Sequence, residues 1–331
     1  MSRDLVVAEN ATVVRTALTP MVWGTTYIVS TEFLPTGRPL LAAMLRALPI
    51  GVVFLLWTRT LPSGSWWWRA AVLGFLNIGA FFALLFVAAF RLPGGVAATA
   101  GALQPVVAAV LAAILLGELF TRRIAVAGLL GVGGVALLVL SPEAALDPVG
   151  VVAALLGTMS MAAGVVLTKY WTRPVDLITF TGWQLTAGGL LLVPVVLVGE
   201  GLPSSVSGTN LVGFVWLGVF GTGLAYANWF RGIGALAVSV TSFLALLSPL
   251  VATLAGWLVL DQRLTTLQAI GAVLVLIAVV LPQLRLSAGA RSTNADATTS
   301  PGAERNTDEG PDTDALGASG APEHHPEPAA T

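Results

Sequence analysis

Long apolar stretches, separated by short polar turns, fill the 331-residue chain from about residue 11 to residue 283. A bilayer core about 30 Å thick requires about 20 mainly apolar residues per helix. Hydrophobic residues make up 56% of the chain and charged residues 10%, against roughly 25% charged residues in typical soluble domains. So few charges cannot cover the surface of a soluble protein. The sequence therefore predicts an all-α integral membrane protein.

Ten of these stretches are long enough to cross a membrane. They lie at about 11–31, 39–57, 68–90, 95–117, 124–141, 148–169, 177–198, 210–230, 236–260 and 265–283. With a cytoplasmic N-terminus, eleven Lys and Arg residues fall on the cytoplasmic side and three in the outer loops. This positive-inside bias favours an even number of spans and cytoplasmic N- and C-termini in the cell (plasma) membrane.

The predicted organisation has four parts. They are a cytoplasmic N-terminus (1–10), two repeats of five spans each (11–141 and 148–283) and a C-terminal tail (286–331). The tail carries eight acidic and two basic residues and almost no large aliphatic ones. Such a segment cannot bury enough apolar area to offset the entropy of ordering. We expect it to be disordered and functionally quiet, with a regulatory or partner-binding role as the alternative.

The evidence for a repeat is an offset of 144 residues that aligns the two halves without gaps from the third span to the start of the fifth. The matched pairs include Gly74 with Gly218, Pro105 with Pro249 and Thr121 with Thr265. At the second span the offset is 138, which pairs Arg46 with Gln184. Because each repeat holds an odd number of spans, the second copy enters the membrane in the opposite sense. Two inverted repeats are typical of secondary transporters, in which the solute sits between the repeats near the midplane.

Pro105 and Pro249 fall inside the fourth and ninth spans. A proline removes one backbone donor and frees a carbonyl group. In lipid this is tolerated only where protein or a wet cavity satisfies the freed group. The two prolines therefore predict a cavity beside these spans, with a simple helix kink as an equally weighted alternative.

The fifth span is rich in glycine, at Gly128, Gly131, Gly133 and Gly134. Glycines at such spacing let helices approach closely. Packing within the chain is the favoured interpretation and a dimer contact the alternative. We therefore expect a monomer or a homodimer.

Several short motifs recur in order along the two halves. They are Trp23-Gly24 in the first span, Ala42-Ala43-Met44-Leu45-Arg46 in the second, Gln104-Pro105 followed by Gly117-Glu118 in the fourth, and Ser248-Pro249 followed by Asp261-Gln262-Arg263-Leu264-Thr265 with Gln268 and Gly271 in the second half. In order and spacing they resemble the motifs of EamA-type transporters of the drug/metabolite transporter superfamily. Gln262 stands where that family has Glu, and Leu119-Phe120 replaces Arg-Leu. The resemblance covers residues 11–283 and implies ten helices, cytoplasmic termini and export of small metabolites such as amino acids.

Arg46 is the only charge clearly inside a predicted span. A charge at the bilayer centre costs roughly 2.5–3.5 kcal/mol on insertion scales, so its side chain should face the helix bundle or water. As a functional group it could bind a solute carboxylate. As a structural group it could pair with Glu32 or extend toward the membrane surface.

Other candidate solute-binding residues combine aromatic rings with neutral polar groups, which suits a modest amphipathic or zwitterionic solute. With Arg46 they are Trp23, Tyr27, Asn77, Gln104, Trp183, Gln184 and Tyr226. The alternative for each is ordinary helix packing with interhelical hydrogen bonds. Because Arg46 and Gln184 are repeat equivalents, we further expect Arg46 to face the outer mouth of a central path and Gln184 the inner mouth.

The sequence contains few of the side chains that enzymes use for catalysis. Cysteine is absent, and the only histidines, His324 and His325, lie in the tail. No Gly-Lys-Ser/Thr phosphate-binding loop occurs. We expect no catalytic residue, cofactor or metal, and no nucleic-acid partner; the expected partners are a small solute (an amino acid, a related metabolite or a drug) and the lipid bilayer. The alternatives are a membrane enzyme of the prenyl or acyl transferase type and a non-transporting receptor.

Overall fold

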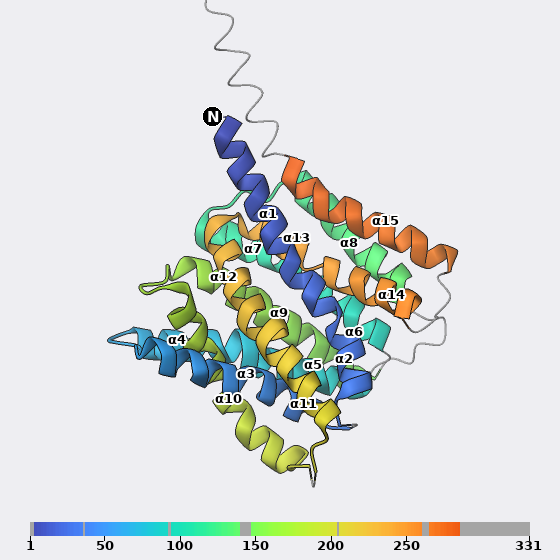
Figure 1. The fold of residues 1–331 in the computed structure, drawn as a ribbon. Coiled ribbons are helices and arrows are strands. Elements are labelled where there is room, and N and C mark those ends of the chain that lie inside the picture. The colour runs from blue at the N-terminus through green and yellow to red at the C-terminus, as the bar shows by residue number, and fades with distance from the viewer. Residues whose placement is uncertain are drawn as a thin grey trace, which may run out of the picture.

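The computed structural model describes residues 3–35, 37–91, 94–139, 147–203, 205–259 and 265–284, and these ranges contain helices and turns without any strand. The elements are α1 (Arg3–Gly24), α2 (Thr26–Phe33), α3 (Pro39–Thr58), α4 (Trp66–Gly74), η1 (Phe75–Gly79), α5 (Ala80–Arg91), α6 (Gly94–Gly101), α7 (Gln104–Leu116), α8 (Arg122–Val139), α9 (Pro148–Tyr170), α10 (Leu177–Gly199), α11 (Gly208–Val215), η2 (Trp216–Leu224), α12 (Ala225–Ala235), α13 (Val238–Leu244), α14 (Leu247–Val259), α15 (Thr266–Val280) and η3 (Leu281–Gln283). The predicted all-α membrane fold is confirmed (Figure 1). The predicted tail, 286–331, and the segment 261–264 lie outside the described residues.

Nine helical stretches of the described ranges are long and apolar enough to cross a membrane. The predicted first span, 11–31, is not among them. There the chain forms α1, which begins near the N-terminus at Arg3, and α2, which follows a break at Thr25. The start of α1 and the end of α15 lie at the same end of the molecule (Figure 1).

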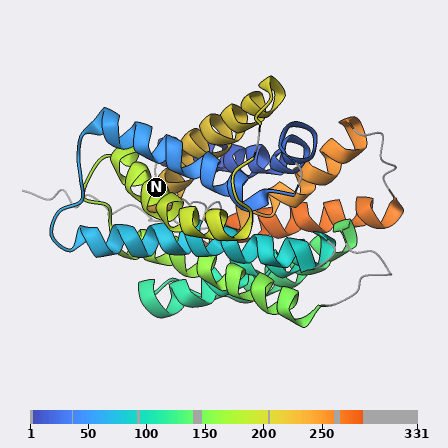
Figure 2. The same cartoon turned by 90° about the horizontal axis from the view of Figure 1, so that it is seen from below.

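The order of elements repeats along the chain. A long helix (α3, α10) precedes a helix interrupted by a π-helix (α4–η1–α5, α11–η2–α12), then a broken helix (α6–α7, α13–α14) and a final helix (α8, α15). Figure 2 shows α4, η1 and α5 as one continuous rod. π-Helices are rare and frequently mark functional sites. Their occurrence at equivalent places in the two halves therefore draws attention to η1 and η2.

Both broken helices restart beside a proline. α6 ends at Gly101 and α7 begins at Gln104, with Pro105 as its second residue; α14 begins at Leu247, two residues before Pro249. A proline has no N–H and a fixed φ, so it fits the first turn of a helix. Each proline therefore starts a new helix in mid-span, instead of bending a continuous one.

Two pairs of repeat-equivalent helices pack through glycines on opposite sides of the bundle, α3 with α10 and α8 with α15 (Figure 1). A methyl group added at Gly134 of α8 would lie 2.9 Å from the carbonyl oxygen of Gly271 in α15. One added at Gly128 or Gly131 would lie 2.3 Å from Val106 Cγ2 or 2.8 Å from Leu246 Cδ1. These three glycines of the fifth span pack within the chain, whereas nothing lies within 4 Å of such a methyl group at Gly133.

This contrast makes a matched pair of variants. Gly134→Val is expected to lower the free energy of unfolding by about 1–3 kcal/mol, because the added side chain meets the backbone of α15. Gly133→Val, one residue away on the open face, is expected to leave stability nearly unchanged. Thermal unfolding of both purified variants in the same detergent measures the difference. Equal unfolding temperatures would show that the α8–α15 contact is not close.

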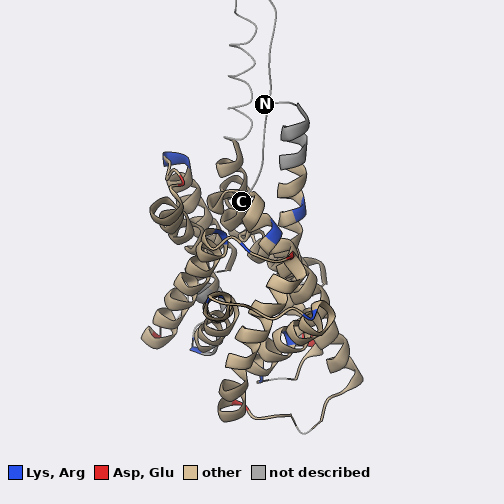
Figure 3. Cartoon of the chain, turned by 90° about the vertical axis from the view of Figure 1, so that its left-hand side faces the viewer, with Lys and Arg blue, Asp and Glu red and all other residues tan. Residues whose placement is uncertain are grey.

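The outer surface of the bundle suits a lipid environment. Large apolar side chains such as Leu56, Trp57, Ile114, Leu129 and Val198 are largely exposed. Lys, Arg, Asp and Glu are sparse in the described ranges and gather mostly at helix ends (Figure 3). A soluble monomer does not expose apolar area on this scale. These faces therefore contact the bilayer.

Candidate functional site: a cavity between the repeats

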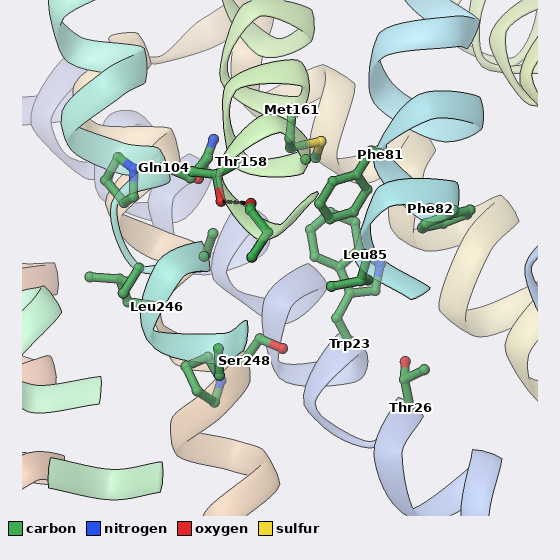
Figure 4. Close-up of a pocket in the computed structure, with 18 of the residues that line it drawn as sticks. Trp23, Thr26, Phe81, Phe82, Leu85, Gln104, Thr158, Met161, Leu246 and Ser248 are labelled. Carbon is green, nitrogen blue, oxygen red and sulfur yellow. Dashed lines mark hydrogen bonds between the residues drawn. The ribbon is translucent and has the colours of Figure 1, made fainter. Parts of the chain in front are cut away.

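A central cavity of about 460 Å³ lies between the two halves of the chain. Its lining comes from α1, α2, α3, α5, α9, α12 and both broken helices. Figure 4 shows Trp23, Phe81 and Leu85 on one side and Gln104, Leu246 and Ser248 on the other. Cavities of this size with apolar walls and few polar groups are typical of small-molecule sites.

A second cavity of about 400 Å³, which we name the entrance cavity, adjoins the first. Its lining includes Ser30 and Leu34 of the first repeat and the residues around the loop that joins α2 to α3. The two cavities share Thr26, Arg46, Phe82 and Leu85 in their linings. A path therefore leads from the loop between α2 and α3, past Arg46, to the centre of the molecule.

Arg46 of α3 sits at the junction of the two cavities, with 9% of its surface exposed. Its Nε donates to the hydroxyl of Thr222 and its Nη2 to the carbonyl oxygen of Gly221, both at 2.8 Å. The guanidinium carbon lies 5.3 Å from the centre of the Phe82 ring. Nη1 donates to no other group in the described ranges. The guanidinium is thus held in place with one edge left for a ligand.

The expected alternative for Arg46 was an ion pair with Glu32. The described residues form two ion pairs, Arg91 with Asp147 and Lys169 with Glu118. Arg46 is in neither, so its charge is stabilised by hydrogen bonds to the second repeat and by the Phe82 ring. A buried cation without an anion is an electrostatic site for one.

An aromatic wall faces Arg46. The ring of Trp23 lies 5.2 Å from those of Tyr226 and Trp229, and its Nε1 donates to the carbonyl oxygen of Gly221 at 3.0 Å. The same carbonyl therefore accepts from Trp23 and Arg46. Gly221 lies within η2, and a π-helix changes the backbone hydrogen-bond register. Its carbonyl oxygen is therefore presented to side chains of the first repeat.

The broken helices place four repeat-equivalent residues on the central cavity. They are Gln104 and Pro105 of α7 and Ser248 and Pro249 of α14. Gln104 is buried, and its Nε2 has no hydrogen-bond partner in the described ranges. The structure thus brings Trp23, Arg46, Gln104, Tyr226, Pro105 and Pro249 together around one space.

Three of the candidate residues lie away from the cavity. Asn77 and Gln184 are buried against each other, where Asn77 Nδ2 donates to Gln184 Oε1 at 2.8 Å and to the Thr168 hydroxyl at 3.2 Å. Trp183 donates to the carbonyl oxygen of Thr60 at 2.8 Å, at the far end of α3. In this structure Gln184 is fully buried, which differs from the expectation that it faces the inner mouth of a central path. Tyr27 belongs to α2, but its side chain lies outside the described residues.

A polar cluster lies at the end of the molecule away from the α2–α3 loop. Gly117, with φ of +68°, ends α7 and turns the chain toward Glu118. The Glu118 carboxylate accepts from the backbone N–H of Val238 at 2.9 and 3.0 Å. Lys169 Nζ donates to Glu118 Oε1 at 3.1 Å and to the Leu236 carbonyl oxygen. Glu118, Lys169 and the start of α13, which we name the Glu118 cluster, therefore tie three helices together.

Sequence reasoning missed several of these residues. Phe82 and Leu85 line the cavity, and the offset of 144 places them on Tyr226 and Trp229, which also line it. Because Tyr226 was a candidate, its repeat equivalent Phe82 could have been predicted from the offset of 144. In the described ranges no group of three or more His, Cys, Asp or Glu side chains could hold a metal ion.

Comparisons with known proteins agree with this architecture. A protein named PecM from Dickeya dadantii is 49% identical over 266 residues, which cover 80% of this chain and 89% of that protein. The uncharacterized inner membrane transporter YedA of Escherichia coli K12 is 27% identical over 275 residues, covering 80% and 88%. A solved crystal structure, 19% identical, matches with a TM-score of 0.72 over 84% of this chain and 99% of its own, which shows the fold.

The match to a protein family is more specific. The model of the EamA-like transporter family matches this chain twice, at residues 12–140 and at residues 148–282. Two consecutive matches span both halves and leave out only the ends of the chain and the segment between them. The predicted resemblance is confirmed, and the chain belongs to the EamA-like transporter family.

Proposed function

We propose that this protein is a secondary transporter of a small amphipathic organic acid, such as an amino acid or a related metabolite. The observation that carries the proposal is Arg46, a buried cation at the mouth of an aromatic cavity that forms no ion pair within the described residues. Its Nη1, which has no hydrogen-bond partner among the residues that the structure describes, would donate to the solute carboxylate. Trp23, Phe82 and Tyr226 would pack on the apolar part of the solute.

Alternating access is the proposed mechanism. In this mechanism the solute reaches the central cavity from the α2–α3 loop, and the hydrogen-bonded Glu118 cluster would close the opposite end. Transport requires a second state in which this cluster opens and the entrance cavity closes. Rocking of one inverted repeat against the other would exchange the two states.

The orientation follows from the distribution of basic residues. We propose that both termini and the Glu118 cluster face the cytoplasm, so that the α2–α3 loop faces outward. The described conformation is then outward-facing, and in export it would be the state that releases solute. The cell membrane is the proposed location.

Exchange transport by purified protein in liposomes tests the proposal. Liposomes loaded with phenylalanine should accumulate labelled phenylalanine saturably, and leucine should compete, whereas phenylalaninamide, which lacks the carboxylate, should compete at least tenfold more weakly. Protein-free liposomes are the control. Equal competition by acids and their amides across a panel of amino acids would contradict the assigned solute class. A panel without any exchange would favour a non-transporting receptor.

A further inference from the structure

The Asn77–Gln184 contact is the repeat counterpart of the contact between Arg46 and η2. Arg46 lies 138 residues before Gln184, and Asn77 lies 144 residues before Gly221. In one copy a long side chain of α3 reaches the π-helix η2; in the other a long side chain of α10 reaches the π-helix η1. A polar contact between equivalent elements therefore occurs twice: at the cavity it joins Arg46 to a backbone carbonyl of η2, and in packed protein it joins Gln184 to the Asn77 side chain of η1.

The buried copy is not fully satisfied. Asn77 Oδ1 and Gln184 Nε2 have no hydrogen-bond partner in the described ranges, and both residues are at most 1% exposed. Exchanging nitrogen and oxygen on both amides keeps their mutual bond and still leaves one polar atom on each without a partner. An unpaired buried polar group costs about 1–3 kcal/mol. This free-energy cost is explained if the two amides have a function in another conformation, in which they are not buried.

Packing around the two copies differs in tightness. A methyl group added at Gly74 would lie 2.7 Å from the carbonyl oxygen of Gln184. At the repeat-equivalent Gly218 it would lie 3.9 Å from the carbonyl oxygen of Arg46, with Ile50 Cγ1 nearer, at 3.3 Å. The helix pair beside Gln184 is therefore closed, and the pair beside Arg46 is looser by about an ångström in the same contact.

We infer that Asn77 and Gln184 form a second polar binding station for the solute, closed in this conformation and opened toward the Glu118 side in the other. The inference rests on the proposed transport function. The solute carboxylate would leave Arg46 and meet the amide N–H groups of this Asn77–Gln184 station. A charged group would thus bind the solute on one side and neutral amides would bind it on the other.

Thiol labelling tests whether the station opens. The chain contains no cysteine, so Gln184→Cys and Asn77→Cys each create a single reporter. A membrane-impermeant maleimide, applied to right-side-out or inverted vesicles without solute, should label both from one side only. Ser63→Cys and Ser205→Cys, in exposed loops at opposite ends of the bundle, identify the two sides. Labelling should match the Ser63 side, because the Ser63 loop and the Glu118 cluster lie at the same end of the bundle: the ring of Trp68, which follows the loop, packs 5.0 Å from that of Trp171, which follows Lys169.

The neighbouring residue supplies a matched control. Leu185 is fully buried in the apolar core beside Gln184, so Leu185→Cys should label at least tenfold more slowly than Gln184→Cys. Labelling of both Gln184→Cys and Asn77→Cys from the Ser205 side, or no faster than Leu185→Cys, would overturn the inference.

The two glycines test the exchange of states independently. Gly74→Ala would clash with the Gln184 backbone only while the station is closed, so it should raise the labelling rate of Gln184→Cys. The expected rise is roughly 5- to 100-fold, the change in population that overpacking by one methyl group produces. Gly218→Ala meets the flexible end of Ile50 and should not raise the rate. Equal labelling rates of Gln184→Cys in the Gly74→Ala and Gly218→Ala backgrounds would contradict the inference that the station is closed in this conformation.

Binding by the station has its own readout. Gln184→Met keeps the length of the side chain and removes its hydrogen bonding. It should raise the KM for phenylalanine about tenfold from the Ser63 side and leave the KM from the Ser205 side within twofold. An unchanged KM from both sides would remove the station from the binding path. Labelling rates require no solute, so they remain valid if the proposed solute class is wrong.

Discussion

Replacing Arg46 with Gln should raise the KM for a carboxylate solute roughly 10- to 150-fold. A hydrogen bond to a charged group contributes about 1.5–3 kcal/mol, and each 1.4 kcal/mol corresponds to a factor of ten. Gln keeps polar contacts to Gly221 and Thr222 within reach but removes the charge. Exchange kinetics of phenylalanine and phenylalaninamide in liposomes measure the effect, which should be confined to the acid.

Arg46→Lys is the matched variant. Lysine keeps the charge, but its compact ammonium group cannot reproduce the planar fork that binds Thr222 and Gly221 while leaving one edge free. We expect a KM between those of the wild type and Arg46→Gln, with membrane abundance near normal in both variants. A loss of abundance in parallel with transport would indicate a purely structural role, and wild-type kinetics in Arg46→Gln would exclude a role in binding.

Replacing Glu118 with Ala should open the side of the cavity that is closed in this structure. The carboxylate accepts from Lys169 and from the start of α13, and the loss of these charge-assisted bonds is worth on the order of 3 kcal/mol. The population of the opposite state should then rise about a hundredfold. The reporter is Ser248→Cys, which faces the central cavity. Impermeant maleimide should label it from the Ser63 side much faster in the Glu118→Ala background.

The control for this experiment is the other ion pair of the described ranges. Arg91 and Asp147 lie 3.6 Å apart with side chains 50% and 38% exposed. Exposed pairs of this kind contribute about 0–1 kcal/mol. Arg91→Gln should therefore leave the labelling pattern of Ser248→Cys unchanged. If Glu118→Ala behaves like Arg91→Gln, the Glu118 cluster does not hold the cavity closed.

Much of the cavity could be predicted from the repeat and the prolines. A proline at the same place in both halves indicated where backbone groups need protein or water, and Pro105 and Pro249 do line the cavity. Arg46 could be predicted to face inward because an isolated charge cannot face lipid. In both cases one large free-energy cost, that of leaving a polar or charged group in contact with lipid, determined where the residue lies.

The position of Asn77 could not be predicted in the same way. Helical spacing assigns faces on the assumption of 3.6 residues per turn, but Asn77 lies within η1, where the wider turn rotates the residues that follow. Gln184 lies on α10, which is covered by α3 on one side and α4 with η1 on the other. When a helix is buried on more than one face, its sequence does not show which of its polar residues face a cavity.

The Glu118 cluster was missed for a different reason. Glu118 and Lys169 are near the ends of spans, where charges are common on any membrane protein, and 51 residues separate them along the chain. Their meeting depends on how α7, α9 and α13 converge in space. Only the Gly117-Glu118 motif indicated that Glu118 has a defined position, because a glycine in the left-handed conformation ends a helix and sets the direction of the next residue.

The buried charge of Arg46 also determines how membrane voltage would act on the transport cycle. An empty site carries one positive charge, and a site loaded with a monoanion carries none. Moving one charge across the whole membrane corresponds to about 2.3 kcal/mol per 100 mV. To the extent that Arg46 shifts within the field, voltage acts on the reorientation of the empty protein and little on that of the protein loaded with a monoanion, whereas a zwitterionic amino acid leaves the positive charge of the site in place. One-for-one exchange of organic anions avoids the empty step and would be nearly insensitive to voltage, whereas net flow in either direction would depend on it.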